Sequence, residues 1–146
     1  MTRRHRRDDR GAVTLEFVVV APALLALLGL LVMAGRVAIA SNSVESAADE
    51  AARSASISRT ASAARAAAED GARRSLAEQD LQCSSIQVDV DTAGFGVPVG
   101  LPAQVHATVT CVVRLSDLAL PGFPGSRTVT ATAVSPLDTY RERGGA

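Results

Sequence analysis

One carboxylate near the N-terminus lies where it could do chemistry. Glu16 is the only charged residue within residues 12–34, and it is the fifth residue after Gly11. An acid within a membrane span costs about 2.5–3.5 kcal/mol on insertion scales, so something should offset it. The dipole at a helix N-terminus favours a negative charge there. Proteolysis after Gly11 would create an α-amino cation on Ala12. This cation could pair with Glu16 of the same chain or of a neighbouring chain. In the second case, the ion pair would set the axial register between packed helices.

The two cysteines, Cys83 and Cys111, are a second candidate for chemistry. If this part of the chain is exported, an even pair in a small domain predicts one disulfide. Such a bond would stabilise the fold by roughly 3–4 kcal/mol in the chain-entropy model. Two buried thiols are the alternative. Neither cysteine belongs to a CxxC pair, and His5 and His106 have no ligand partners nearby, so we expect no metal site.

The remaining polar motifs do not suggest an enzyme. Gly94, Gly96 and Gly100 form a glycine-rich stretch without the strand and helix that a phosphate-binding loop requires. Asp89 and Asp91 could hold calcium, but a solvated strand face is the simpler interpretation. One Tyr, three Phe and no Trp leave little material for a large cofactor pocket. We therefore expect no catalysis, no cofactor and no small-molecule substrate.

The residues around Glu16 belong to a segment that could cross a membrane. Residues 12–34 are apolar apart from Glu16, and at 1.5 Å per residue they span a hydrocarbon core of about 30 Å. Pro22 should kink this helix, and Arg36 marks its far interface. The sequence predicts a cytoplasmic leader over residues 1–11 and a transmembrane helix over residues 12–35.

The charges are distributed unevenly, although the net charge is zero. Residues 1–10 carry five Arg against Asp8 and Asp9, which gives +3, and the remainder carries ten Arg against 13 acids, which gives −3. A basic block beside an apolar run indicates a cytoplasmic N-terminus and an extracytoplasmic C-terminus. A nucleic-acid-binding arm is the alternative. Because the block is short and contains two Asp, we expect no direct contact with nucleic acid.

Residues 36–80 are expected to continue the helix outside the cytoplasm. Small side chains recur at helical spacing along residues 37–79 and form a narrow stripe. Its members are Val37, Val44, Ala48, Ala51, Ala55, Ile57, Ala61, Ala64, Ala68 and Ala72. Three acid-to-base pairs at i, i+4 support the helix, with Gly71 as its weak point. They are Asp49–Arg53, Glu69–Arg73 and Asp70–Arg74. A low-complexity Ala/Ser linker is the alternative.

Residues 81–146 are expected to form a small β-domain with a C-terminal tail. Alternating apolar and polar residues predict strands over residues 86–90, 104–115 and 128–134, separated by turns rich in Gly and Pro. Three strands with one apolar face need a cover, and the small-residue stripe provides it. The predicted fold class is α+β: a long N-terminal helix packed on a small three-stranded antiparallel sheet.

The stretch RGAVTLEF at residues 10–17 resembles the signal of type IV pilins and pseudopilins. The longer segment RGAVTLEFVVVAPALLALLGLLVMAGRVAIASNSVESAADEAARSAS is similar to the TadE-like pseudopilins of the tight-adherence pilus system. That resemblance includes Pro22 six residues after Glu16, the exit Gly35-Arg36 and the later Ala51-Ala52-Arg53. The terminal VTATAVSPLDTYR also resembles the end of actinobacterial members. The resemblance covers most of residues 10–60 and the last strand.

The resemblance implies a minor pseudopilin that helps to initiate or anchor pilus assembly. A membrane prepilin peptidase would cleave between Gly11 and Ala12, and Glu16 would be the assembly carboxylate. The implied partners are the bilayer, the peptidase and other pilin and pseudopilin subunits. The family does not require a disulfide, so the pairing of Cys83 with Cys111 rests on the residues alone.

Two other interpretations stay open. Ala38-Ile39-Ala40 resembles a site for ordinary signal peptidase, and cleavage there would release residues 41–146 as a secreted protein. The apolar stretch is, however, about twice the usual length of a signal-peptide core. The chain could also remain an uncleaved single-pass anchor that presents an extracytoplasmic interaction domain.

Overall fold

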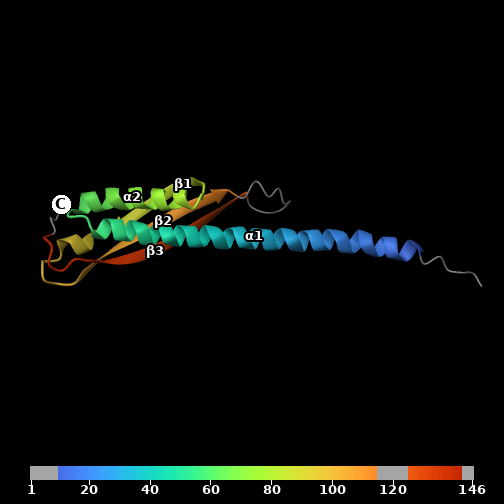
Figure 1. Cartoon of the computed structure of the whole chain (residues 1–146), viewed down its shortest axis with the longest axis horizontal. Helices are drawn as coiled ribbons and strands as arrows, with labels where there is room; N and C mark the ends of the chain where they lie inside the picture. Colours follow the sequence, from blue (N-terminus) through green and yellow to red (C-terminus); the bar gives the residue numbers. More distant parts are fainter. Residues whose placement is uncertain (1–9, 115–124, 143–146) are drawn as a thin grey trace, which may run out of the picture. The chain divides into compact units, whose positions relative to one another are not determined.

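The computed structural model describes residues 10–114 and 125–142. Two helices precede three strands in this part of the chain (Figure 1). They are α1 (Arg10–Ser56), α2 (Ala61–Glu78), β1 (Cys83–Asp91), β2 (Ala103–Arg114) and β3 (Ser126–Leu137), with a 3-10 turn η1 (Ala93–Gly96) after β1. This arrangement confirms the α+β class. The chain divides into two compact units, Met1–Arg36 and Val37–Ala146.

The described side chains of α1 between residues 18 and 34 are all apolar or glycine. The large aliphatic side chains among them are exposed. They are Val18, Val20, Leu24, Leu25, Leu27, Leu28, Leu30, Leu31 and Val32. Pro22 lies inside the helix without ending it. By length and composition, the helix from Val20 onward could cross a membrane, as the sequence predicts.

The helix expected to continue through residues 36–80 is divided in two. α1 ends at Ser56, and α2 begins after Thr60, whose hydroxyl accepts a hydrogen bond from the Ala63 amide at 3.2 Å as an N-cap. The prediction of one unbroken helix was wrong. A helix over residues 37–79 would be about 65 Å long, whereas a strand of twelve residues spans about 40 Å. The turn therefore lets both helices cover one sheet.

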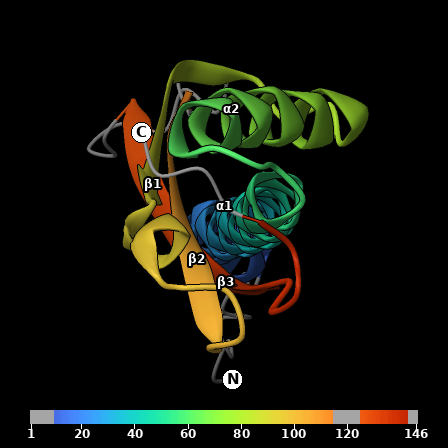
Figure 2. The ribbon, with the colours of Figure 1, turned by 90° about the vertical axis from the view of Figure 1, so that its left-hand side faces the viewer.

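The core of the second unit lies between the two helices and the sheet. Both helices lie on the same face of the sheet (Figure 2), with α2 against β1. Ser135 of β3 donates a hydrogen bond to the Ser56 hydroxyl of α1 at 3.0 Å. Seven of the ten residues of the small-residue stripe are buried. Val37 and Ala61 are only half-buried, and Ile57, which lies after the end of α1, is 66% exposed. The fully buried positions include Val44, Ala48, Ala51, Ala55, Ala64, Ala68, Ala72, Leu76, Val105, Ala107, Val109 and Cys111.

The three strands form an antiparallel sheet in the order β1-β2-β3. The β1–β2 ladder has a bulge between Cys83 and Ser85, whereas the β2–β3 ladder is regular from Ala103↔Leu137 to Arg114↔Ser126. All three predicted strands are confirmed. β1 and β3 are longer than predicted, whereas β2 begins one residue earlier, at Ala103, and residue 115 lies outside the described residues. The central strand β2 presents alternate side chains to the helices.

Gly71, expected to weaken the helix, is instead the point where α2 meets α1 closely. It is buried. A Cβ at this position would lie 2.8 Å from Ser54 Oγ and 3.2 Å from the carbonyl oxygen of Glu50. The absence of a side chain therefore sets how near the two helices approach each other.

The three predicted ion pairs have different outcomes. Arg73 and Glu69 form a salt bridge at 2.7 Å on the exposed side of α2. Asp49–Arg53 and Asp70–Arg74, which lie entirely within the described residues, do not form salt bridges there. Exposed pairs contribute little to stability, so the buried small residues determine the packing.

Candidate functional site: the N-terminal helix

The predicted processing junction lies in the first turn of α1. The helix begins at Arg10, so Gly11 and Ala12 are its second and third residues. The side chains of residues 10–17, including that of Glu16, and the whole of residues 1–9 lie outside the described part. The first four amides of a helix have no intrahelical acceptor. The bond between Gly11 and Ala12 is therefore in the part of the helix that opens at the lowest cost.

Glu16 follows Ala12 by four residues within the same helix. Residues at i and i+4 share one helix face, about 6 Å apart along the axis. Helical side chains also lean toward the N-terminus. Helix geometry therefore places residues 12 and 16 one turn apart on the same face of α1.

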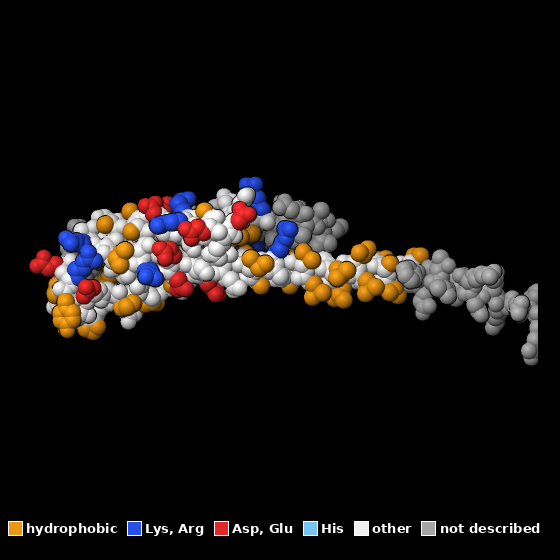
Figure 3. Space-filling view, viewed as in Figure 1, with side chains coloured by type: hydrophobic (Ala, Val, Ile, Leu, Met, Phe, Trp, Pro, Cys, Tyr) orange, Lys and Arg blue, Asp and Glu red, His pale blue; other side chains and the backbone are white. Residues whose placement is uncertain are grey.

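The rest of this helix presents hydrophobic groups to its surroundings. Figure 3 shows hydrophobic side chains along the described part of α1 that precedes Arg36. Leu25 and Leu31 are 69% and 60% exposed, which in water would be a large apolar surface. A bilayer or a set of similar helices would remove that surface from water.

The alternative cleavage site after Ala40 lies in the middle of α1. Ala40 is 3% exposed, and the Ser41 hydroxyl donates a hydrogen bond to the Val37 carbonyl at 3.0 Å. The second compact unit begins at Val37. A cut after Ala40 would therefore remove four residues from that unit, one of them buried.

Cys83 and Cys111 form the predicted disulfide, with Cα atoms 5.5 Å apart. Cys111 is fully buried beneath the helices. Cys83 is the first residue of β1, opposite Val113. The bond therefore joins the start of β1, just after α2, to the central strand.

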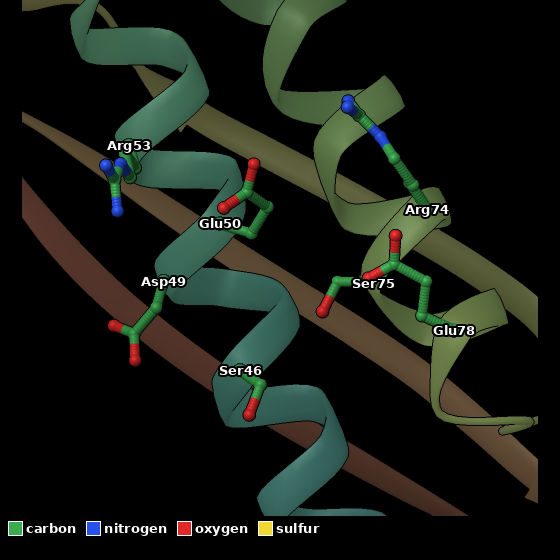
Figure 4. Close-up of a pocket in the computed structure, with 7 residues that line it drawn as sticks. All are labelled: Ser46, Asp49, Glu50, Arg53, Arg74, Ser75 and Glu78. Carbon is green, nitrogen blue, oxygen red and sulfur yellow. The ribbon is translucent and has the colours of Figure 1, made fainter.

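A polar groove of about 430 Å³ lies between α1 and α2 within the second unit. It is lined by Ser46, Asp49, Glu50, Arg53, Arg74, Ser75 and Glu78. Figure 4 shows the side chains of Glu50, Ser75 and Glu78 toward the space between the helices, while Asp49 and Arg53 point away from α2. The charges are mixed and do not converge on one point, so the groove suggests no particular ligand.

Asp91, an acidic residue at the end of β1, bonds to a backbone amide two residues further along the chain. Asp91 accepts a hydrogen bond from the Ala93 amide at 2.9 Å and so begins the turn η1. Asp91 is opposite His106 of β2. Within residues 10–114 and 125–142, no group of three or more His, Cys, Asp or Glu is arranged to hold a metal ion.

Sequence reasoning did not find the contact that fixes the C-terminal segment. The Arg141 guanidinium donates a hydrogen bond to the Ile57 carbonyl at 2.8 Å, and the Gly100 amide donates to the Thr139 carbonyl at 2.8 Å. These bonds join three segments that are far apart in the sequence. A single Arg near the end of a chain carries no local signal for such a contact.

The comparison with known families concerns the N-terminal part of the chain. Residues 11–53 match the family model for TadE-like proteins. Among curated proteins and solved structures there is no match. The matched range begins at Gly11, covers most of the helix that could cross a membrane and ends three residues before the end of α1. Over residues 11–53, which are less than half of its length, the chain is therefore similar to TadE-like proteins.

Proposed function

We propose that this chain is a minor pseudopilin that takes part in assembling or anchoring a tight-adherence pilus. The observation that carries this proposal is the TadE-like match over residues 11–53, which includes Gly11, Glu16 and an apolar helix. In this role the protein has no catalytic activity and needs no cofactor. Its partners are the bilayer, a prepilin peptidase and other pilin and pseudopilin subunits.

Processing between Gly11 and Ala12 would create a cationic partner for Glu16. The new α-amino group would lie one helical turn from residue 16. In an assembly, it could instead pair with Glu16 of an adjacent subunit. Because a pair of buried charges tolerates little displacement, it fixes the axial register of packed helices.

The expected topology has a cytoplasmic N-terminus and an extracytoplasmic second unit. The five Arg in the first ten residues support this orientation through the positive-inside rule. The bond between Cys83 and Cys111 also supports it, because disulfides persist mainly outside the cytoplasm. The burial of Ala40 within α1 argues against the secreted alternative.

N-terminal sequencing of protein purified from membranes of the native cell tests the proposal. We expect the mature chain to begin Ala-Val-Thr-Leu-Glu, because cleavage follows Gly11. A start at Ser41 would establish the secreted protein instead. A start at Met1 or Thr2, in cells that contain the peptidase, would establish an uncleaved anchor.

Replacing Glu16 with alanine should separate processing from assembly. We expect cleavage after Gly11 to continue, while the amount of subunit recovered with pili falls by about tenfold, which corresponds to a loss of about 1.4 kcal/mol of pairing free energy. Quantitative blotting of sheared pili and membranes measures both. Thr14→Ala, in the same turn, is the control and should assemble normally. Normal recovery of the Glu16 variant would refute the register role.

A further inference from the structure

The two cysteines of the disulfide lie in different surroundings, although both belong to the second unit. Cys111 is 0% exposed, whereas Cys83 is only half-buried. Cys111 is part of the central strand β2, and Cys83 is the first residue of β1, which is an edge strand of the sheet. The bond therefore has an inner sulfur, that of Cys111, and an outer sulfur, that of Cys83.

Cys111 is surrounded by apolar residues of the core. Ile86 of β1 and Val129 of β3 are its neighbours across the sheet. Val109, two residues earlier in β2, is also fully buried. These residues pack together with buried alanines of α1 and α2, which lie over this face of the sheet (Figure 2). A reagent in solution therefore cannot reach the inner sulfur while the two helices cover the sheet.

Cys83 lies in a more open part of the chain. The residues on either side of it, Gln82 and Ser84, are exposed, and the ladder between β1 and β2 is irregular between Cys83 and Ser85. The Ser84 hydroxyl donates a hydrogen bond to the Val112 carbonyl at 2.9 Å, which holds this segment against β2. Cys83 is therefore accessible from solvent without any opening of the sheet.

This difference in access determines how the bond can exchange with other thiols. A disulfide exchanges when a thiolate attacks one of its two sulfur atoms and the other sulfur leaves, so the reaction depends on which sulfur the thiolate can reach. Attack on Cys83 releases the sulfur of Cys111 inside the core. Attack on Cys111 would require the reagent to enter the core first, which costs the packing of the helices against the sheet. The accessible path therefore begins at Cys83.

We propose that Cys83 is a thiol–disulfide exchange site through which an external reagent closes and opens the bond, with Cys111 as the internal partner. To close the bond, the Cys83 thiolate attacks an external disulfide, and one half of that reagent leaves as a thiol with the proton that Cys83 gave up. The Cys111 thiolate then attacks Cys83 Sγ, and the second half leaves as a thiol with the proton of Cys111. Two thiols of the chain are oxidised to one disulfide, and the external disulfide is reduced to two thiols.

The oxidising reagent has to come from outside the chain. The sequence contains two cysteines, and both form this bond, so no third thiol can transfer a disulfide within the chain. An oxidoreductase with its own pair of cysteines and a small-molecule disulfide are two sources of the same chemistry. With either source the second unit is the substrate, and Cys83 is the residue that becomes joined to the reagent.

The internal step is expected to be slow in the folded unit. Cys111 has to be a thiolate in order to attack Cys83, because the thiolate is the reactive form of cysteine. A charge in apolar surroundings is costly, and the residues around Cys111 supply no cation in the core. A mixed disulfide on Cys83 should therefore persist long enough to be isolated.

Reduced glutathione tests the proposal on the purified full chain with its bond intact. After a short exposure under native conditions, acid stops the exchange, and peptide mapping by mass spectrometry locates the bound glutathione. We expect the adduct on Cys83 to be at least about tenfold more abundant than that on Cys111. The same exposure in denaturant is the matched control and should modify both cysteines to within about twofold, because unfolding exposes Cys111.

Two results of this experiment would overturn the proposal. One is a native ratio of the two adducts equal to that in denaturant, or in favour of Cys111. The other is a native chain that acquires no adduct at all, while the denatured chain is modified. Both would show that the exposure of Cys83 does not give a thiol access to the bond.

Single-cysteine variants made in the native cell distinguish the two sources. Cys111→Ala removes the internal partner, so an adduct on Cys83 is trapped. A larger, reductant-sensitive band on gels identifies an oxidoreductase, and a small added mass on the Cys83 peptide identifies a small-molecule disulfide. Cys83→Ala is the control and should carry at least about tenfold less of either adduct. Equal amounts in the two variants, or no adduct in either, would overturn the assignment of Cys83 in the cell.

Failure of this inference can be distinguished from failure of the proposed function. The glutathione experiment uses purified protein and does not depend on where the second unit lies, whereas the experiment in cells rests on its expected extracytoplasmic location. N-terminal sequencing of the same material reports on processing. A start at Ala12 without any adduct on Cys83 would contradict the exchange site alone. A start at Ser41 or Met1 together with the adduct would contradict the proposed function alone.

Discussion

Replacing Cys83 and Cys111 together with alanine is expected to lower the free energy of unfolding of the second unit by roughly 3–4 kcal/mol. The bond closes a loop with a sequence separation of 28, and its loss gives the unfolded chain more conformations. Cys111 is fully buried, so its truncation adds a small cavity cost to the same total. Thermal unfolding followed by circular dichroism should show the midpoint fall by 10 °C or more.

Reductant provides the matched control for this variant. Adding it to the wild type should reproduce most of the loss in stability. Reduction breaks the bond but leaves both sulfur atoms in the core. Adding it to the double variant should change nothing. If the reduced wild type kept its original midpoint while both thiols could be titrated, the stabilisation assigned to the bond would be wrong.

Gly94→Ala is expected to destabilise the second unit by about 3 kcal/mol, the upper part of the usual range for overpacking. A Cβ on Gly94 would overlap the carbonyl oxygen of Gln104 and lie 3.1 Å from Leu137 Cδ1. The carbonyl belongs to the central strand and cannot move without disturbing the ladder on either side. The turn η1 would therefore lift from the sheet and expose Phe95, which is 2% exposed.

Gly96→Ala is the control, because it makes the same change two residues away in the same turn. A Cβ on Gly96 meets nothing within 4 Å, so this variant should unfold within a few tenths of a kcal/mol of the wild type. Denaturant titration of both variants gives the comparison. Equal midpoints would show that η1 does not rest on β2 as described.

The sequence predicts the elements of this fold better than their connections. Alternation identifies β2 because its buried and exposed residues differ sharply, as in Val105 and His106. Small residues at helical spacing likewise identify which helix positions are buried. The turn at residues 57–60 was missed because the Ala-rich segments on both sides of it favour helix locally. Only the need to cover a short sheet makes the chain reverse.

The candidate site is predicted from the cost of one charge, whereas the helices and strands are predicted from the spacing of apolar residues. Gly11 and Glu16 stand out because one charge within a long apolar segment is rare and costly. The disulfide was predicted from the number of cysteines and an expected compartment rather than from geometry.

The bond between β1 and β2 also determines how the second unit would respond to a pulling force. A load applied along the chain could separate β3 from β2, but it could not extend the closed loop that joins Cys83 to Cys111. With about 3.4 Å per extended residue, that loop withholds about 95 Å of contour length. Under load the second unit would therefore lengthen less before rupture than an equal chain without the bond.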